Sequence, residues 1–191
     1  ADPKLKGKIC SRPGSHVYNR ALMASMIAAK GVGEAEQWAK GLVSNLAKRP
    51  QGNDRSQLKS IYSGECDVAI INHYYYGKLT YSKNPDHRKW AKASIIVFPN
   101  QGPSDRGAHV NISGGGVVKF SKNQELAIKF LEFLVTEQAQ ILYGDVNFEY
   151  PINNKSKLPT RLKALGTFKE DSLLIEDIAK LAPKAQEIID T

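Results

Sequence analysis

Short apolar runs alternate with longer amphipathic segments in the first half of the chain. Residues 8–12 predict a strand, and residues 17–30, where apolar side chains recur every three or four positions, predict a helix. Gly31 and Gly33 end that helical pattern, and residues 34–48 predict a second helix with one apolar face. This alternation indicates an α/β architecture.

A second strand is predicted directly after a third helix. Residues 54–63 have a helical pattern, with Asn53 or Asp54 as its N-cap. The run 68–71 is continuously apolar, which is typical of a central parallel strand covered on both faces, and residues 94–98 predict a further strand. Because ligands bind at the carboxyl ends of strands in open α/β sheets, function is expected directly after residues 68–71.

The pattern changes in the second half of the chain. Residues 109–120 predict an extended segment, and residues 123–136 predict a strongly amphipathic helix that continues toward Leu142. Residues 159–165 predict a helical turn, and residues 172–189 carry helical patterns that Pro183 is expected to interrupt. The side chains of the amphipathic helix that are expected to face inward are Leu126, Phe130, Leu131 and Leu134.

Composition adds two constraints. With 41% apolar and 24% charged residues among 191, the chain has the composition of an ordinary folded soluble protein, and its start carries no apolar signal segment, so any export signal is expected to have been removed. The 27 Lys and Arg against 19 Asp and Glu give a net charge of +8, so an anionic partner must be considered. The basic residues are spread along the chain, however, which makes a nucleic-acid-binding module a weak alternative.

The two cysteines, Cys10 and Cys66, each open a short apolar run, and neither belongs to a Cys-x-x-Cys motif. They can form one disulfide or remain two thiols. Adjacent parallel strands would bring the two sulfurs together. An oxidising compartment would then favour the bridge, and the cytosol would favour the thiols.

The motifs of common enzymes are missing. The sequence has no Walker phosphate loop, no Gly-x-Ser-x-Gly elbow and no His-Glu-x-x-His helix. The glycines at 114–116 lack the spacing of a dinucleotide-binding loop and predict a bend. Ser56 and Lys59 match the Ser-x-x-Lys spacing of some hydrolases, but this spacing arises by chance in polar helices. We therefore expect no enzyme activity, with a hydrolase as an alternative.

Tyrosines gather where ligand binding is expected. Tyr74, Tyr75 and Tyr76 follow the second predicted strand, and Tyr18 opens the helix after the first. If these strands are parallel neighbours, Tyr18, Tyr74 and Tyr75 meet at one edge of the sheet. Phenols are poor bases at neutral pH, but a ferric ion can displace the phenolic proton and bind the phenolate. From the pattern alone, rings that pack in a core or stack on an organic ligand are the favoured interpretation, because tyrosine clusters are commonly packing and recognition devices.

Six segments together carry a family resemblance: residues 6–10, 15–19, 64–70, 72–79, 109–118 and 149–151. In this order they resemble the ferric-iron-binding proteins of bacterial ABC uptake systems, which are periplasmic binding proteins with two hinged lobes. The resemblance implies that Tyr74 and Tyr75 match the adjacent tyrosine ligands of this family. Tyr18 matches the additional tyrosine of the subgroup that binds iron without a synergistic anion. Tyr76 is not counted as a ligand, and Lys78 would help to neutralise the phenolates.

The fold implied by the resemblance is α/β: the C-terminal lobe of a type II periplasmic binding protein, a mostly parallel sheet flanked by helices, plus part of the N-terminal lobe. Residues 1–107 would form the first part of the C-terminal lobe, residues 108–148 a partial N-terminal lobe segment, and residues 149–191 the return to the C-terminal lobe with its C-terminal helices. Because the family's chains are longer, the sequence resembles a fragment that lacks an N-terminal segment and the further ligand which that segment supplies.

The implied function is periplasmic binding of ferric ion through tyrosine phenolates at an interlobe cleft, and its delivery to an ABC transporter permease for iron uptake. Carbonate or citrate would serve as a possible synergistic anion. No nucleic-acid partner is expected, and the fragment is expected to self-associate through its exposed partial lobe. The alternative is a binding protein of the same fold for an organic or anionic small molecule.

Overall fold

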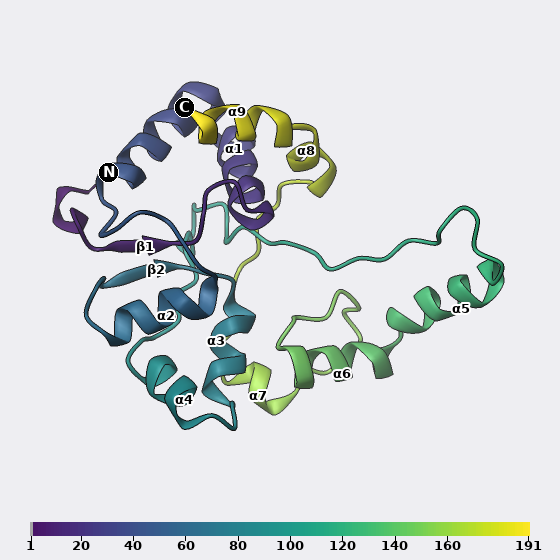
Figure 1. Cartoon of the computed structure of the whole chain (residues 1–191). Helices are drawn as coiled ribbons and strands as arrows, with labels where there is room; N and C mark the ends of the chain where they lie inside the picture. The colour runs from purple at the N-terminus through teal and green to yellow at the C-terminus, as the bar shows by residue number, and fades with distance from the viewer. Residues whose placement is uncertain (1) are drawn as a thin grey trace. The chain divides into compact units, whose positions relative to one another are not determined.

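The computed structural model describes residues 2–191, which divide into two compact units. Unit 1 comprises Ala1–Asn111 and Phe168–Thr191, and unit 2 comprises Ile112–Thr167. Figure 1 labels the elements of both units, and each unit is described by itself. The assignment of residues 108–148 to a second lobe stays a prediction.

Unit 1 contains a two-stranded parallel sheet that follows a 3-10 turn, η1 (Pro3–Leu5). Strand β1 (Ile9–Ser11) pairs with β2 (Val68–Ile70), which confirms both predicted strands and their parallel pairing. The prediction that the second strand is covered on both faces is wrong, because Val68 is exposed and its two successors are half-buried. A sheet of two strands has no central strand, so β2 keeps an open edge, while a parallel bridge from Ile9 to Leu46 covers part of the other edge of β1.

The strand predicted at residues 94–98 is also wrong. In the described structure this segment belongs to no strand, and Ile95 and Val97 are 83% and 73% exposed. β-branched residues favour an extended backbone, but a strand forms only where a neighbour supplies hydrogen-bond partners and packing.

The long helical pattern of the first half forms α1 (Val17–Ser44), which is kinked at Gly31. Gly31 has a φ of 79°, so the predicted break between two helical segments is confirmed. The third predicted helix is α2 (Asp54–Tyr62), which begins with a capping box in which Asn53 and Ser56 satisfy each other's backbone N–H groups.

Two short helices follow β2: α3 (His73–Thr80) and α4 (Pro85–Lys92). Their sequences lack a clear helical repeat, and no helix is predicted at either. The side chains of Leu58, Leu79 and Ala91 form a buried cluster that joins them to α2. Tertiary packing therefore stabilises helices that are too short to form alone.

The chain ends in α8 (Ile175–Lys180) and α9 (Ala182–Asp190), which confirms the predicted C-terminal helices. The expectation that Pro183 interrupts them is wrong in detail. The break falls at Leu181, and Pro183 lies in the first turn of α9, where a missing N–H costs nothing. Both helices pack on α1 in the main core cluster, which contains Met23, Ala24, Met26, Ile27, Ala35, Ile178 and Ala185.

The two cysteines form a disulfide. Cys10 in β1 and Cys66, two residues before β2, have Cα atoms 5.9 Å apart, and both side chains are buried. Of the two alternatives that the sequence leaves open, the structure contains the bridge. It links β1 to the segment directly before β2, and the tyrosines lie in the helices that follow these two strands.

Unit 2 is helical and contains α5 (Gln124–Leu134), α6 (Glu137–Asn147) and α7 (Thr160–Lys163), as predicted. The predicted inward face of α5 is wrong for Leu126 and Phe130, which are 67% and 58% exposed; Leu131 and Leu134 are half-buried. In the part of unit 2 that the structure describes, there is no strand against which the apolar face of α5 could pack. Self-association through it stays a prediction.

No helix among residues 2–191 combines the length and apolar character needed to cross a lipid bilayer.

Unfolding of unit 1 is expected to depend on pH through His109. Burial and the positive charge of Arg106 lower the pKa of this imidazole, against smaller opposing effects of the Asn111 side chain and of Asp171. A folded-state pKa below the unfolded value of about 6.5 means that protons favour the unfolded chain. The free energy of unfolding should therefore fall as the pH drops below about 6.5, by at most about 1.4 kcal/mol per pH unit for one proton.

Urea unfolding at pH 7.5 and 5.5 measures this effect, with His109→Gln as the variant that cannot titrate. The wild-type chain should lose more stability than His109→Gln between these two conditions. Equal losses would show that another group carries the dependence.

Candidate functional site

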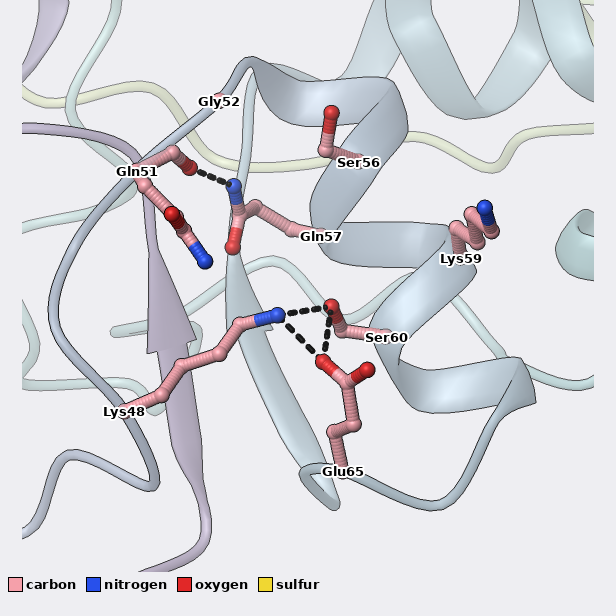
Figure 2. Close-up of a pocket in the computed structure, with 8 residues that line it drawn as sticks. All are labelled: Lys48, Gln51, Gly52, Ser56, Gln57, Lys59, Ser60 and Glu65. Carbon is pink, nitrogen blue, oxygen red and sulfur yellow. Dashed lines mark hydrogen bonds and ion pairs between the residues drawn. The ribbon is translucent and has the colours of Figure 1, made fainter.

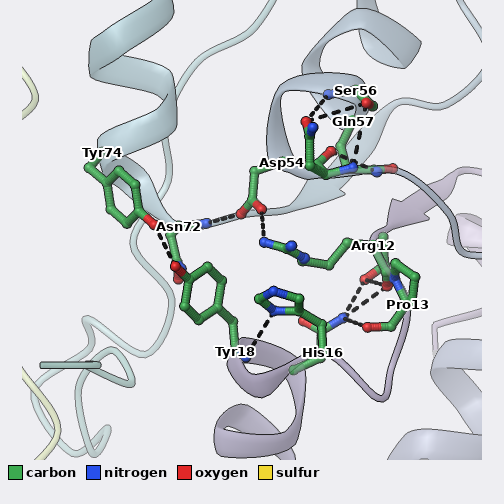
Figure 3. A network of polar contacts seen from close by, with 12 residues as sticks. Arg12, Pro13, His16, Tyr18, Asp54, Ser56, Gln57, Asn72 and Tyr74 are labelled. Carbon is green, nitrogen blue, oxygen red and sulfur yellow. Dashed lines mark hydrogen bonds and ion pairs between the residues drawn. The ribbon is translucent and has the colours of Figure 1, made fainter. Parts of the chain in front are cut away.

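The structure brings the tyrosines together in unit 1. Tyr18 lies in the first turn of α1 and Tyr74 in the first turn of α3, and their hydroxyl oxygens are 2.8 Å apart (Figure 3). The ring of Tyr75 lies against that of Tyr74, with centroids 4.3 Å apart. Both helices begin shortly after the carboxyl ends of paired strands, which is why residues 56 positions apart in sequence meet.

Tyr74 holds its phenolic proton tightly. Burial raises the pKa of Tyr74 well above its ordinary value, and the hydrogen-bonding interactions with Tyr18 and Tyr75 raise it further. Tyr74 therefore keeps its phenolic proton at physiological pH. A ligand that requires its phenolate must supply enough positive charge to displace this proton.

A cation lies over each of the three rings. The pairs are Arg12 with Tyr18 at 5.0 Å, Lys78 with Tyr74 at 5.1 Å, and Arg55 with Tyr75 at 5.2 Å from side-chain head group to ring centroid. These positive charges favour electron-rich rings and would offset the charge of phenolates. The resemblance implies that Lys78 helps to neutralise the phenolates, and this role stays a prediction; its ammonium lies over the ring of Tyr74.

Sequence reasoning missed a polar network beneath the tyrosines. Arg12 and Asp54 form an ion pair at 2.5 Å, and Asp54 also accepts the backbone N–H of Asn72 at 2.8 Å (Figure 3). The position of Arg12 at the end of the predicted strand 8–12 was the available signal, because it places this side chain at the same sheet edge as the tyrosines.

Two neighbours of the cluster have structural roles. The hydroxyl of Tyr76 donates to the carbonyl of Ser94 at 3.4 Å, and its ring packs against the core of α2, α3 and α4. His16 is the N-cap of α1 and accepts the backbone N–H of Tyr18 through Nδ1. Burial and the charge of Arg12 lower the pKa of His16, so its imidazole remains the neutral acceptor that this cap requires.

A separate pocket of about 300 Å³ lies beside α2 (Figure 2). Its lining includes Lys48, which contacts both Ser60 and Glu65, and the hydrolase candidates Ser56 and Lys59. Ser56 is used in the capping box of α2, and the Lys59 ammonium lies 5.8 Å from the ring centroid of Trp90. The two side chains thus have separate structural contacts and do not form a nucleophile and base pair.

The donor set decides which metal chemistry is open to the tyrosine cluster. Within residues 2–191, no three His, Cys, Asp or Glu side chains gather as a metal site. The tyrosine cluster offers phenol oxygens, and such hard oxygen donors suit a hard cation such as ferric iron better than zinc or copper(I).

Comparison with known proteins agrees with the fold. A ferric-binding protein from Campylobacter jejuni is 42% identical and superposes with a TM-score of 0.93, over 99% of this chain and 59% of its own. A Trichodesmium protein, solved in complex with iron and citrate ligands, is 43% identical, with a TM-score of 0.92 over 99% of this chain and 59% of its own. These scores confirm the predicted type II periplasmic binding protein fold.

Among curated proteins, iron uptake protein A1 of Synechocystis is 42% identical over 99% of this chain and 52% of its own length. The chain thus spans about half the length of the curated relatives it matches. The family model of bacterial extracellular solute-binding proteins matches residues 18–141. This stretch includes Tyr18, Tyr74 and Tyr75 and covers more than half of the sequence, so the chain belongs to the bacterial extracellular solute-binding protein family.

Proposed function

We propose that the chain is part of a ferric-ion carrier for bacterial iron uptake and that Tyr18, Tyr74 and Tyr75 are its iron ligands. The observation that carries the proposal is the 2.8 Å contact between the hydroxyls of Tyr18 and Tyr74, with Tyr75 alongside. A ferric ion would replace the phenolic protons and bridge these oxygens. Relatives named for ferric iron binding or iron uptake support the choice of metal.

The three phenolates would leave coordination positions open to water or to a small anion. Arg55 and Lys78 lie over the rings of Tyr75 and Tyr74, and their positive charge favours an anion beside the metal. The related Trichodesmium structure contains citrate with its iron. We infer that carbonate or citrate completes the ferric site of this chain.

The expected partner is an ABC transporter permease that receives the iron, and the expected compartment is the periplasm. The family of extracellular solute-binding proteins supports both, and the buried disulfide between Cys10 and Cys66 suits an oxidising compartment. Such a protein binds and releases its ligand without transforming it, so no catalytic residue is assigned.

The alternative is a carrier for an organic anion. The adjoining rings of Tyr74 and Tyr75, with a cation over each, would also stack on a planar anionic ligand. Equilibrium dialysis against iron and a panel of organic anions separates the two functions. Retention of an anion in the absence of iron would favour this alternative.

Ferric titration of the chain tests the main proposal. Visible absorbance should rise as phenolates transfer charge to iron, with weak affinity that strengthens when citrate or bicarbonate is added. Zinc, which has no such charge-transfer transition, is the matched control and should give no visible band. Absence of the band with iron, at concentrations where dialysis shows the metal bound, would reject tyrosine ligation.

A further inference from the structure

A buried ion pair lies beneath the tyrosine cluster. The side chains of Arg12 and Asp54 are only 10% and 1% exposed, and Arg12 Nη1 lies 2.5 Å from Asp54 Oδ2. Among the described residues, Arg12 Nε has no hydrogen-bond partner. A buried pair with an unsatisfied donor recovers its desolvation cost poorly, so stability alone is a weak reason for its presence.

Asp54 is tied to the helix that carries two of the tyrosines. Its Oδ1 accepts the backbone N–H of Asn72 at 2.8 Å, and Asn72 is the N-cap of α3. Asn72 makes no capping hydrogen bond with its own side chain, so Asp54 is the contact that fixes the start of this helix. Tyr74 and Tyr75 are the second and third residues of α3, so a shift at Asn72 moves both phenols.

Arg12 is tied to the third tyrosine. Its guanidinium lies 5.0 Å from the ring centroid of Tyr18, and its carbonyl oxygen accepts a hydrogen bond from Asn19 Nδ2 at 3.0 Å. Asn19 directly follows Tyr18 in α1. Arg12 therefore contacts both the ring of Tyr18 (Figure 3) and, through Asn19, the helical turn that holds it.

These contacts form a continuous ring of interactions. Arg12 pairs with Asp54, Asp54 binds the backbone of Asn72 at the start of α3, and α3 carries Tyr74. The hydroxyl of Tyr74 contacts that of Tyr18, whose ring lies against Arg12. We propose that Arg12 and Asp54 are positioning residues that set the spacing between the Tyr18 and Tyr74 hydroxyls. Their consequence for ferric affinity rests on the proposed function, whereas their effect on hydroxyl geometry does not.

Asp54 is poorly placed to act as an iron ligand itself. Its two carboxylate oxygens are already engaged by Arg12 and by the backbone of Asn72, and its side chain is almost completely buried. Removing Arg12 alone would leave this carboxylate buried without a counter-charge and threaten folding. The test therefore removes both charges together.

The experiment compares the wild-type chain with Arg12→Met/Asp54→Leu. The first readout needs no iron: the chain is labelled with ¹³C at the tyrosine ring carbon that bears the hydroxyl, and Tyr18→Phe and Tyr74→Phe assign the two NMR signals. In the double variant both signals should move, while the signal of Tyr76 stays. The second readout is ferric titration, where the dissociation constant should rise by about tenfold to a hundredfold, as is typical when partners of metal ligands are lost.

Two further variants sharpen the result. Arg12→Lys keeps the positive charge, so its ferric affinity and its tyrosine signal positions should lie between those of the wild-type chain and those of Arg12→Met/Asp54→Leu. Lys8 and Asp67 form an exposed ion pair at 3.2 Å. Each directly precedes one of the strands β1 and β2, so the pair lies at the amino ends of the strands, whereas the tyrosines follow their carboxyl ends. Lys8→Gln/Asp67→Asn is therefore the matched control and should change neither readout.

Each outcome decides the proposal. Movement of the Tyr18 and Tyr74 signals in Arg12→Met/Asp54→Leu, with none in the Lys8 and Asp67 control, supports positioning. Unmoved signals overturn it, whether or not iron binding is lost. Equal changes in Lys8→Gln/Asp67→Asn would also overturn it, because they would show that the loss of any ion pair beside these strands moves the tyrosines. If the wild-type chain binds no iron, the ferric function fails, and the NMR signals still decide the role of this pair.

Discussion

Tyr74→Phe and Tyr75→Phe should each remove most of the visible absorbance that ferric iron produces with this chain. A phenylalanine ring keeps the packing of its position but offers no oxygen to the metal. The loss of a direct ligand should weaken ferric binding by more than about a hundredfold, beyond the loss typical of a supporting partner. Tyr18→Phe should act in the same direction, because its hydroxyl lies 2.8 Å from that of Tyr74.

The matched control for these variants is Tyr76→Phe. Tyr76 follows Tyr75 directly, but its hydroxyl points to the carbonyl of Ser94 and its ring to the core. Visible titration with ferric citrate measures all four variants side by side. A band that survives unchanged in Tyr74→Phe and Tyr75→Phe would contradict tyrosine ligation, and equal loss in Tyr76→Phe would point to a disturbed fold.

Removal of the disulfide with Cys10→Ala/Cys66→Ala should lower the free energy of unfolding by about 4 kcal/mol at 25 °C. The bridge closes a loop of 56 residues, and the loss of this constraint lets the unfolded chain explore many more conformations. Both sulfurs are buried, so the folded chain should resist reduction while the unfolded chain does not. Urea unfolding with and without a strong reductant measures the difference.

The variant provides its own control for this measurement. Reductant should lower the unfolding midpoint of the wild-type chain toward that of Cys10→Ala/Cys66→Ala and leave the variant unchanged. A difference of less than about 1 kcal/mol would contradict the prediction, since it lies far below the usual contribution of a native disulfide.

Much of the local structure was predictable from the sequence. The capping box at Asn53, the glycine break at Gly31 and the apolar runs at residues 8–12 and 68–71 are encoded by neighbouring residues. The errors occur where distant parts of the chain decide the outcome. The segment 94–98 has the composition of a strand, but in the described structure no neighbouring strand pairs with it.

In the candidate site, too, the sequence indicated some residues and only the structure revealed others. The tyrosines were found because they follow predicted strands, and the resemblance to ferric-binding proteins gave them a role. Asp54 looks in sequence like an ordinary helix cap, and Arg12 like the end of a strand. Their pairing across 42 residues depends on the packing of α2 against the sheet, which no local pattern encodes.

By itself, the sequence determined most of the longer helices, the two paired strands and the position of the tyrosines after them, because hydrogen bonds between near neighbours and the side-chain period act locally. Only the tertiary structure decided that Tyr18 and Tyr74 touch, that Cys10 and Cys66 are joined, and that a buried ion pair lies beneath the phenols. Such contacts join positions 42 to 56 residues apart, and the whole core must pack before they can form.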